Sequence, residues 1–210
     1  YTDFNINRPT AYNIQYAEID GQEVHVEPVV RFGGADSRLH GLAGLRYFHG
    51  TQDEFVNIFG GSTFKDKTDT HSAFAELTYA LTPQVDVTAA SRLEREHRRR
   101  DGGSQAVRID FDETYTVFLP KLDVAWKPTD TQTYGAKIAR GYNAGGGGIT
   151  IGTPVVSYTY GSEYVWNYEL YTRHHLKDAN VVLTGNIFYN DYKDMQLPYS
   201  LGENYSVIRN

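Results

Sequence analysis

The histidines are the first residues in this sequence whose type could support metal chemistry. His174 and His175 are adjacent, and the remaining histidines are scattered along the chain. Adjacent residues of a strand point to opposite faces, so this pair cannot chelate one ion together. No histidine has zinc-site spacing, and the chain has no cysteine to supply a thiolate. We therefore expect no metal site, no cofactor and no catalytic thiol, and we interpret the pair as solvated residues near a turn.

Carboxylates are the next candidates for chemistry, because two of them can form the acid and base of a glycosidase. Glu94, Glu96, Glu163 and Glu169 are of the right type, but nothing in the sequence brings two of them together beside a substrate cleft. No nucleophile elbow or catalytic triad pattern is present. We expect no catalytic residues, and we interpret these carboxylates as belonging to loops or to a polar interior.

The stretch GYNAGGGG, residues 141–148, is rich in glycine but lacks the Lys-Ser/Thr pair of a phosphate-binding loop. No helical pattern follows it, so a nucleotide site is not predicted. The first interpretation is a flexible extracellular loop. The second is a ligand-contacting loop, in which Tyr142, Asn143, Tyr158 and Tyr160 offer ring faces and hydrogen-bonding groups.

Composition and charge narrow the class of protein. The net charge of −6 argues against a broad nucleic-acid surface, so we expect no nucleic-acid partner. The chain has 17 Tyr, 10 Phe and 20 Gly against a single Met, which favours strands and turns over helices. No stretch approaches the roughly 18 apolar residues of a membrane-spanning helix.

Strict alternation of apolar and polar residues recurs along the chain and predicts strands. In VDVTAASRL, residues 85–93, the odd positions are mostly apolar or small and the even positions mostly polar. Counting all such stretches predicts about ten strands of roughly 9–11 residues, long enough to cross a bilayer at a tilt. The positions expected on the apolar face include Leu77, Val87, Val124 and Ile138, and those expected on the polar face include Arg92, Asp123 and Lys137.

The connections alternate in length, which predicts an antiparallel up-and-down meander. Residues 82–84, 128–132 and 177–180 are short and rich in Pro, Asp, Thr and Asn, as in tight turns. The stretches expected to form long polar loops are residues 50–70, 98–110, 143–162 and 193–204.

The two faces of the sheet are expected to meet lipid and water, respectively. Full charges lie on the polar face well inside strands, as in a wet barrel lumen. Tyr79, Trp126 and Tyr134 flank the short turns on the apolar face, and Tyr47, Tyr164, Trp166 and Tyr189 lie towards the long loops. Two such clusters are typical of interfacial girdles. The fold class is therefore all-β, a transmembrane barrel in lipid, and about ten strands must either close a small barrel or belong to a larger one.

Two longer segments resemble a known family. FLPKLDVAWKPTDTQTYGAKIARGYNAGGGG, residues 118–148, is similar to the late barrel strands of TonB-dependent outer-membrane receptors, with a Pro-Lys pair, a short turn, an Arg-Gly-aromatic step and a Gly-rich loop. SEYVWNYELYTRHHLKDANVVLTGNIFYNDYKDMQLP, residues 162–198, resembles the next hairpin, whereas residues 1–117 fit by strand pattern alone.

This resemblance implies an outer-membrane transporter of a scarce nutrient, foremost a ferric siderophore, that works with the inner-membrane protein TonB. We expect residues 1–210 to form roughly half of a barrel domain, with the plug domain, its TonB box and the final strands outside it. Iron would be carried by the siderophore, so the barrel itself needs no metal ligands. A passive porin or a structural outer-membrane barrel is the alternative.

Overall fold

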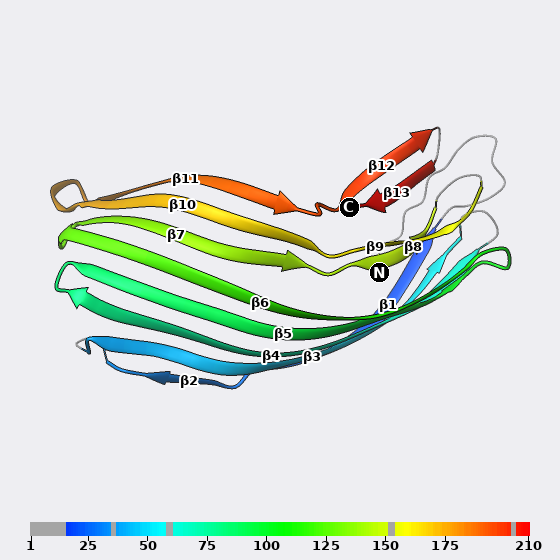
Figure 1. Cartoon of the computed structure of the whole chain (residues 1–210), viewed down its shortest axis with the longest axis horizontal. Helices are drawn as coiled ribbons and strands as arrows, with labels where there is room; N and C mark the ends of the chain where they lie inside the picture. The colour runs from blue at the N-terminus through cyan, green and yellow to red at the C-terminus, as the bar shows by residue number, and fades with distance from the viewer. Residues whose placement is uncertain (1–15, 35–36, 58–60, 151–153, 203–204) are drawn as a thin grey trace.

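The computed structural model describes residues 16–34, 37–57, 61–150, 154–202 and 205–210 and has an all-β architecture (Figure 1). Alternating side chains and abundant aromatics favour strands throughout, as expected. The strands are β1 (Ala17–Val26), β2 (Val29–Phe32), β3 (Leu39–Val56), β4 (Ser62–Thr82), β5 (Val85–Gly103), β6 (Arg108–Thr129), β7 (Gln132–Asn143), β8 (Gly146–Ile149), β9 (Ser157–Tyr160), β10 (Glu163–Leu176), β11 (Val181–Lys193), β12 (Leu197–Gly202) and β13 (Tyr205–Arg209).

Nine of these strands form one antiparallel sheet in the order β1-β3-β4-β5-β6-β7-β10-β11, with β2 also paired to β3. β1 and β2 occupy the same edge because both pair with β3. The break between them contains Pro28, which cannot donate a ladder hydrogen bond. The sheet is curved and unclosed, with β11 at its other edge (Figure 1). The predicted up-and-down meander is confirmed.

The three predicted tight turns gather at one end of the sheet, here called the short-turn end (Figure 1). They join β4 to β5, β6 to β7 and β10 to β11, the last through a 3-10 turn at Lys177–Ala179. Asn180 closes that turn with φ 50°, a left-handed conformation that Asn tolerates better than most residues.

The strands are longer than the sequence predicted. β3 to β6 contain 18, 21, 19 and 22 residues, so most of the expected loops 50–70 and 98–110 is strand. The reason is that the polar residues there pair across strands instead of being free in solution. Arg100, for example, forms ion pairs with Glu54 on β3 and Asp66 on β4.

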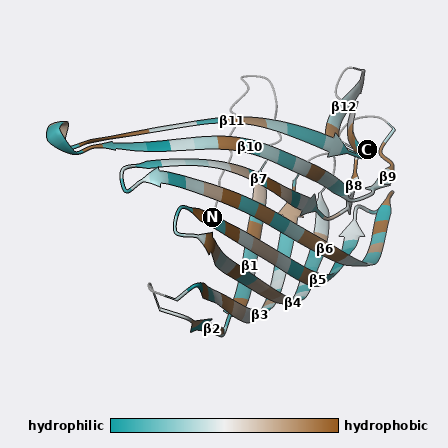
Figure 2. Cartoon of the chain, turned by 60° about the vertical axis from the view of Figure 1, so that its left-hand side comes forward, coloured by the Kyte–Doolittle hydropathy of each residue, from teal (hydrophilic) through white to brown (hydrophobic). Residues whose placement is uncertain are grey.

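Register places the two kinds of side chain on opposite faces, because directly paired residues share a face. Leu77 pairs with Ala89, Ala89 with Leu122, and Leu122 with Ile138, which forms one apolar row. Val87 likewise pairs with Val124. The faces alternate along each strand, as the coloured bands of Figure 2 show. This surface is called the apolar face below.

The opposite surface, called the polar face, carries the charges predicted for it. Ion pairs between strands here include Lys121 Nζ to Glu76 at 2.9 Å, Lys127 to Asp86 at 2.5 Å and Lys137 to Glu169 at 2.5 Å. Tyr171 donates a hydrogen bond to Asp123 at 2.8 Å, and Arg92 contacts Glu94 at 2.5 Å. The polar face is therefore held together by charge pairs, not by apolar packing.

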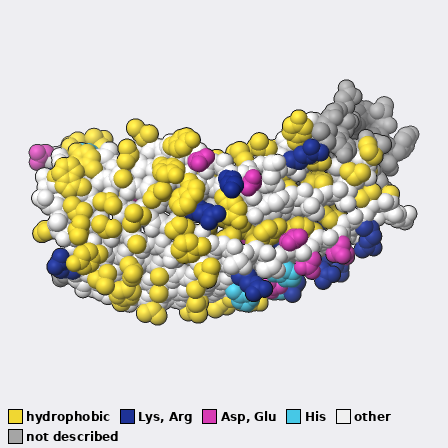
Figure 3. Space-filling view, viewed as in Figure 1, with side chains coloured by type: hydrophobic (Ala, Val, Ile, Leu, Met, Phe, Trp, Pro, Cys, Tyr) yellow, Lys and Arg dark blue, Asp and Glu magenta, His cyan; other side chains and the backbone are white. Residues whose placement is uncertain are grey.

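Apolar side chains dominate the part of the sheet towards the short turns, and charges gather towards the other end (Figure 3). Trp126 and Tyr134 lie 5.6 Å apart near the short turns, and Tyr168 and Tyr189 lie 6.3 Å apart on the paired strands β10 and β11. Within the described residues, no helix is long and apolar enough to cross a membrane.

Candidate functional site

A small hairpin, β8–β9, packs against the polar face at the end opposite the short turns, here called the hairpin end. Beneath it lie Phe64, Ile109 and Phe111, which form the main buried cluster of the described residues. Each is at most 6 % exposed. The interpretation of residues 141–148 as a flexible loop is therefore wrong for Gly146–Gly148, which belong to a paired strand.

Steric fit explains the glycines of this hairpin. A Cβ added to Gly147 would lie 2.5 Å from Ile109 Cδ1 and 3.3 Å from Phe111 Cβ, so only glycine lets the hairpin lie flat on the sheet. On the other side of the hairpin, the rings of Tyr160 and Tyr158 lie over the two neighbouring glycines with which they pair. The glycine run thus serves two contacts at once, one with the sheet and one with its own tyrosines.

A cavity of about 420 Å³ opens between the hairpin and the sheet. Residues of both the hairpin and the sheet line it, among them Tyr158, Tyr160, Phe64, Ile149 and Arg100. The two tyrosine rings lie 6.4 Å apart. Aromatic walls around one charged group can hold a ligand that has both planar and polar surfaces.

Arg100 is fixed in this cavity by partners on two other strands. Its Nη2 donates to Glu54 Oε2 at 2.6 Å and its Nη1 to Asp66 Oδ2 at 2.5 Å. The guanidinium lies 4.2 Å above the ring of Phe64. Burial opposes its charge, but these carboxylate bonds outweigh burial and raise the pKa of Arg100. Burial raises the pKa of Asp66 despite the nearby guanidinium.

The structure brings two of the four predicted ligand residues together in this cavity, Tyr158 and Tyr160. Tyr142 is the second-last residue of β7 and packs between Tyr115 and Tyr164, with ring centroids 6.2 and 5.6 Å away. Its hydroxyl is buried and has no hydrogen-bond partner among the residues that the structure describes. Asn143 also lies outside the cavity lining, because its amide is bonded elsewhere.

Comparison with known proteins identifies the family to which this curved antiparallel sheet belongs. Residues 1–210 match the family described as "TonB dependent receptor-like, beta-barrel". The chain belongs to this family of TonB-dependent receptor barrels. Its members are transporters of the Gram-negative outer membrane and not enzymes, and ligand uptake with TonB is the function that the family implies.

Three solved receptors share the fold. The ferric yersiniabactin uptake receptor FyuA from Yersinia pestis is 21 % identical with a TM-score of 0.74, and the match covers 94 % of this chain and 31 % of that one. The alcaligin outer-membrane receptor FauA from Bordetella pertussis is 13 % identical (TM-score 0.64, covering 93 % and 34 %). The ferric-catecholate import receptor Fiu from E. coli K12, in its open form, is 13 % identical (TM-score 0.60, covering 86 % and 31 %). This chain therefore spans about a third of the length of these receptors.

Family membership orients the receptor barrel. Short turns of such barrels face the periplasm and long connections face the outside, so the hairpin end is extracellular. The apolar face meets lipid and the polar face lines the lumen. The hairpin thus folds inwards over the lumen at its outer mouth, where a ligand arriving from outside would meet it.

One group of residues at the base of the receptor's hairpin, centred on Gln196, was not predicted from the sequence. Gln196 Nε2 donates to the carbonyl oxygens of Ala144 and Gly161, both at 2.9 Å, and its Oε1 accepts from Asn143 Nδ2 at 3.0 Å. Its backbone N–H donates to Glu163 at 2.6 Å. Gln196 therefore ties together the chain on both sides of the hairpin. No periodic signal marks a single glutamine 33 residues or more from its partners.

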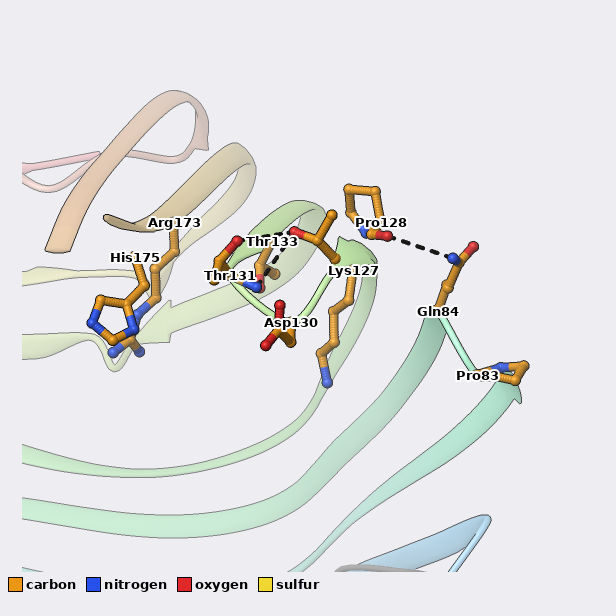
Figure 4. A pocket seen from close by; sticks show the side chains of 10 residues that line it. Pro83, Gln84, Lys127, Pro128, Asp130, Thr131, Thr133, Arg173 and His175 are labelled. Carbon is orange, nitrogen blue, oxygen red and sulfur yellow. Dashed lines mark hydrogen bonds between the residues drawn. The ribbon is translucent and has the colours of Figure 1, made fainter. Parts of the chain in front are cut away.

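A second cavity, of about 650 Å³, lies between the periplasmic turns of the receptor (Figure 4). Lys127, Asp130, Arg173 and His175 line it. His174 lies on the other side of β10, with its ring against Tyr134 at 5.2 Å. The prediction that the two adjacent histidines point apart is thus confirmed. Among the described residues, no three His, Asp or Glu side chains form a group that could hold a metal.

Proposed function

We propose that the full-length receptor imports a ferric siderophore, and that the cavity beneath the β8–β9 hairpin forms part of its outer binding site. The observation that carries this proposal is the position of the hairpin, which presents two tyrosine rings and a fixed arginine at the extracellular mouth of the lumen. Two of the three matched receptors are named for uptake or import of a ferric ligand, which supports the same class of ligand here.

Ligand contact is assigned to Tyr158 and Tyr160, whose rings are half-buried and can stack on a planar chelating group. Each such contact contributes about 0.5–1.5 kcal/mol beyond simple burial. Arg100 adds a cation that two carboxylates already hold in place, so its geometry costs little to fix on binding. Tyr142 and Asn143 have a supporting role, because their side chains pack or bond at the base of the hairpin.

TonB is the proposed energy-coupling partner, acting through a plug domain with a TonB box outside residues 1–210. The barrel segment contributes the wall and the outer mouth of the pathway. Iron is cargo in this scheme, and the chelate supplies all of its ligands.

The test uses the full-length receptor in a strain that grows on one ferric siderophore as its sole iron source. Exchanging Tyr158 and Tyr160 together for Ala should weaken binding of the ferric siderophore about 5–150-fold, the product of two stacking contacts. Tyr199→Ala, at an exposed tyrosine on β12, is the matched control and should bind as wild type. Folding of every variant is checked by heat-dependent mobility on gels.

Two outcomes would overturn this function. A double variant that binds every siderophore tested as wild type does would remove the hairpin from the site. A full-length deletion with normal growth under iron limitation, but with slower entry of small neutral solutes, would favour the passive porin instead.

A further inference from the structure

The charges around the hairpin cavity of the receptor do not favour an anionic ligand. Among the described residues that line the cavity, Glu54 and Arg100 are the charged ones. Asp66, on the neighbouring strand β4, accepts a second hydrogen bond from Arg100 at 2.5 Å. Two carboxylates therefore hold one guanidinium, and this group of three, called the Arg100 cluster below, carries one uncompensated negative charge.

The two carboxylates of the Arg100 cluster already repel each other. Burial and, more weakly, the charge of Glu54 raise the pKa of Asp66. The guanidinium is fixed between them, because its Nη2 donates to Glu54, its Nη1 donates to Asp66 and its plane lies 4.2 Å from the Phe64 ring. Each of these two nitrogens has a second N–H, which can donate to an uncharged oxygen of a ligand. Arg100 thus offers hydrogen bonds, but its charge is already cancelled.

The hairpin that covers the cavity brings no charge to it. Residues 141–162, which comprise the hairpin and its flanks, contain no Lys, Arg, His, Asp or Glu. Much of the remaining lining is apolar and includes Val56, Phe64, Ile149, Val155 and Ile208. Such a lining suits a ligand with an apolar outer surface, and it has no cation to offset the negative charge of the Arg100 cluster.

The other arginines on the lumenal side of β5 are also matched by carboxylates. Arg98 is bonded to Glu96, and Glu113 lies opposite Arg98 in the register of β5 and β6. Farther down the strand, Arg92 contacts Glu94 at 2.5 Å. An anion that moves along this strand into the lumen would therefore meet a carboxylate beside every lumenal arginine.

Ferric chelates differ in charge according to their chelating groups. A hydroxamate carries one negative charge, so three hydroxamates neutralise a ferric ion. A catecholate carries two negative charges, so three catecholates leave the ferric complex a trianion. The charge of the cavity therefore discriminates between these two classes of siderophore.

We propose that this cavity selects a ferric chelate without net charge, of the trishydroxamate class, and that Glu54 excludes anionic chelates by cancelling the charge of Arg100. Planar hydroxamate groups can stack on Tyr158 and Tyr160, and their oxygens can accept the remaining N–H groups of Arg100. This inference rests on the siderophore function proposed above and names the chemical class of its ligand.

A single uncompensated charge is enough for this selection. At the dielectric constant of water and low ionic strength, a trianion centred roughly 8 Å from that charge loses about tenfold in affinity relative to a neutral chelate. A lower effective dielectric constant in the half-enclosed cavity increases the difference. Selectivity of this kind arises from repulsion of the wrong ligand as well as from contacts with the right one.

The experiment uses the purified full-length receptor in detergent at an ionic strength of about 10 mM, at which charges act over roughly 30 Å. Quenching of tryptophan fluorescence measures binding of two probes, the neutral ferric complex of a cyclic trihydroxamate and the trianionic ferric complex of a cyclic tricatecholate. Wild type should bind the neutral complex about tenfold more tightly. Glu54→Gln keeps an oxygen for Arg100 but removes the charge, so it should bind the trianion about tenfold more tightly than wild type and the neutral complex equally well.

Asp53→Asn is the matched control, because it makes the same change in net charge on the opposite face of β3, where the Asp53 side chain is 73 % exposed. It should leave both affinities unchanged. Heat-dependent mobility must show that every variant is folded before its affinity is compared.

Four results would overturn the inference. They are equal binding of both complexes by wild type, tighter binding of the trianion by wild type, unchanged affinity of Glu54→Gln for the trianion, and an equal gain in Asp53→Asn. If wild type binds neither complex, the trishydroxamate class is wrong. The siderophore function itself falls only if the variant with Ala at positions 158 and 160 also binds every siderophore as wild type does.

Discussion

Gly147→Ala is the sharpest test of the docked hairpin, because the structure defines which atoms would collide. The new Cβ would lie 2.5 Å from Ile109 Cδ1, well inside contact distance. Ile109 is only 3 % exposed, so its side chain is packed on almost every side. Overpacking of this kind costs about 1–3 kcal/mol. The equilibrium between docked and undocked hairpin should therefore shift about 5–150-fold towards the undocked state.

Hydrogen exchange of the full-length receptor measures this shift directly. Amides of β8 and β9 should exchange faster in Gly147→Ala, and affinity for the ferric siderophore should fall in parallel. Adding Ile109→Val removes the colliding Cδ1 atom, so the double variant should regain protection relative to Gly147→Ala alone. Gly34→Ala is the control, because a Cβ there meets nothing within 4 Å. Unchanged exchange in Gly147→Ala, or no recovery in the double variant, would refute the packing described here.

Three further outcomes are expected. Leu77→Arg, near the middle of the lipid-facing band, should lower the free energy of unfolding of the full-length barrel in lipid vesicles by about 2–4 kcal/mol. Thr78→Arg, on the lumenal face, should lower it by less than about 1 kcal/mol. Equal losses would refute the assignment of faces. Gln196→Ala removes three side-chain hydrogen bonds and should speed amide exchange in the hairpin. Exchange in β4 and β5 should stay unchanged, since faster exchange there would indicate a global loss of stability instead. For Asp69 burial alone would raise the pKa, but bonds from His49 and Lys67 lower it, and the pKa of Asp112 is lowered by its histidine bond. Amide protection at the extracellular strand ends, corrected for intrinsic exchange rates, should therefore be complete above the ordinary carboxyl pKa of 3.8. It should be lost as the pH falls through the lowered pKa values that Asp69 and Asp112 have in the folded state. A loss of protection already between about pH 5 and 7 would contradict this direction.

The sequence predicted the membrane-spanning part of the sheet well, because lipid on one face and water on the other impose a strict two-residue period. Leu77, Val124 and Ile138 fall on the face assigned to them for this reason. The extracellular strand ends were not predicted, since both of their faces meet water and the period disappears. In these strand ends, pairing of charges across strands takes the place of the two-residue period. Arg100 and its partner Glu54 are 46 residues apart in the sequence, so the pattern of a single strand does not reveal their pairing.

The candidate site could be predicted only in part for a similar reason. Tyr158 and Tyr160 stand out by type, but their contacts with Gly148 and Gly146 depend on a hairpin whose first strand has no side-chain pattern at all. From sequence alone, a run of glycines indicates a flexible segment. The buried side chains of the sheet beneath Gly147 show that glycine is needed there because the hairpin backbone lies so close to the sheet.

The continuous ladder from membrane to extracellular end constrains how this receptor can diversify. Inserting a single residue midway along β5 would reverse the facing of every residue beyond it, so that the lumenal Arg100 would point outwards and Arg99 inwards. The strands on either side, β4 and β6, would lose their matching charges at the same time. Changes of length are therefore tolerated in pairs of residues shared by neighbouring strands, or in the hairpin and the turns. New ligand preferences should therefore arise along the ladder mainly by substitution, and at the extracellular mouth also by changes in the length of the hairpin.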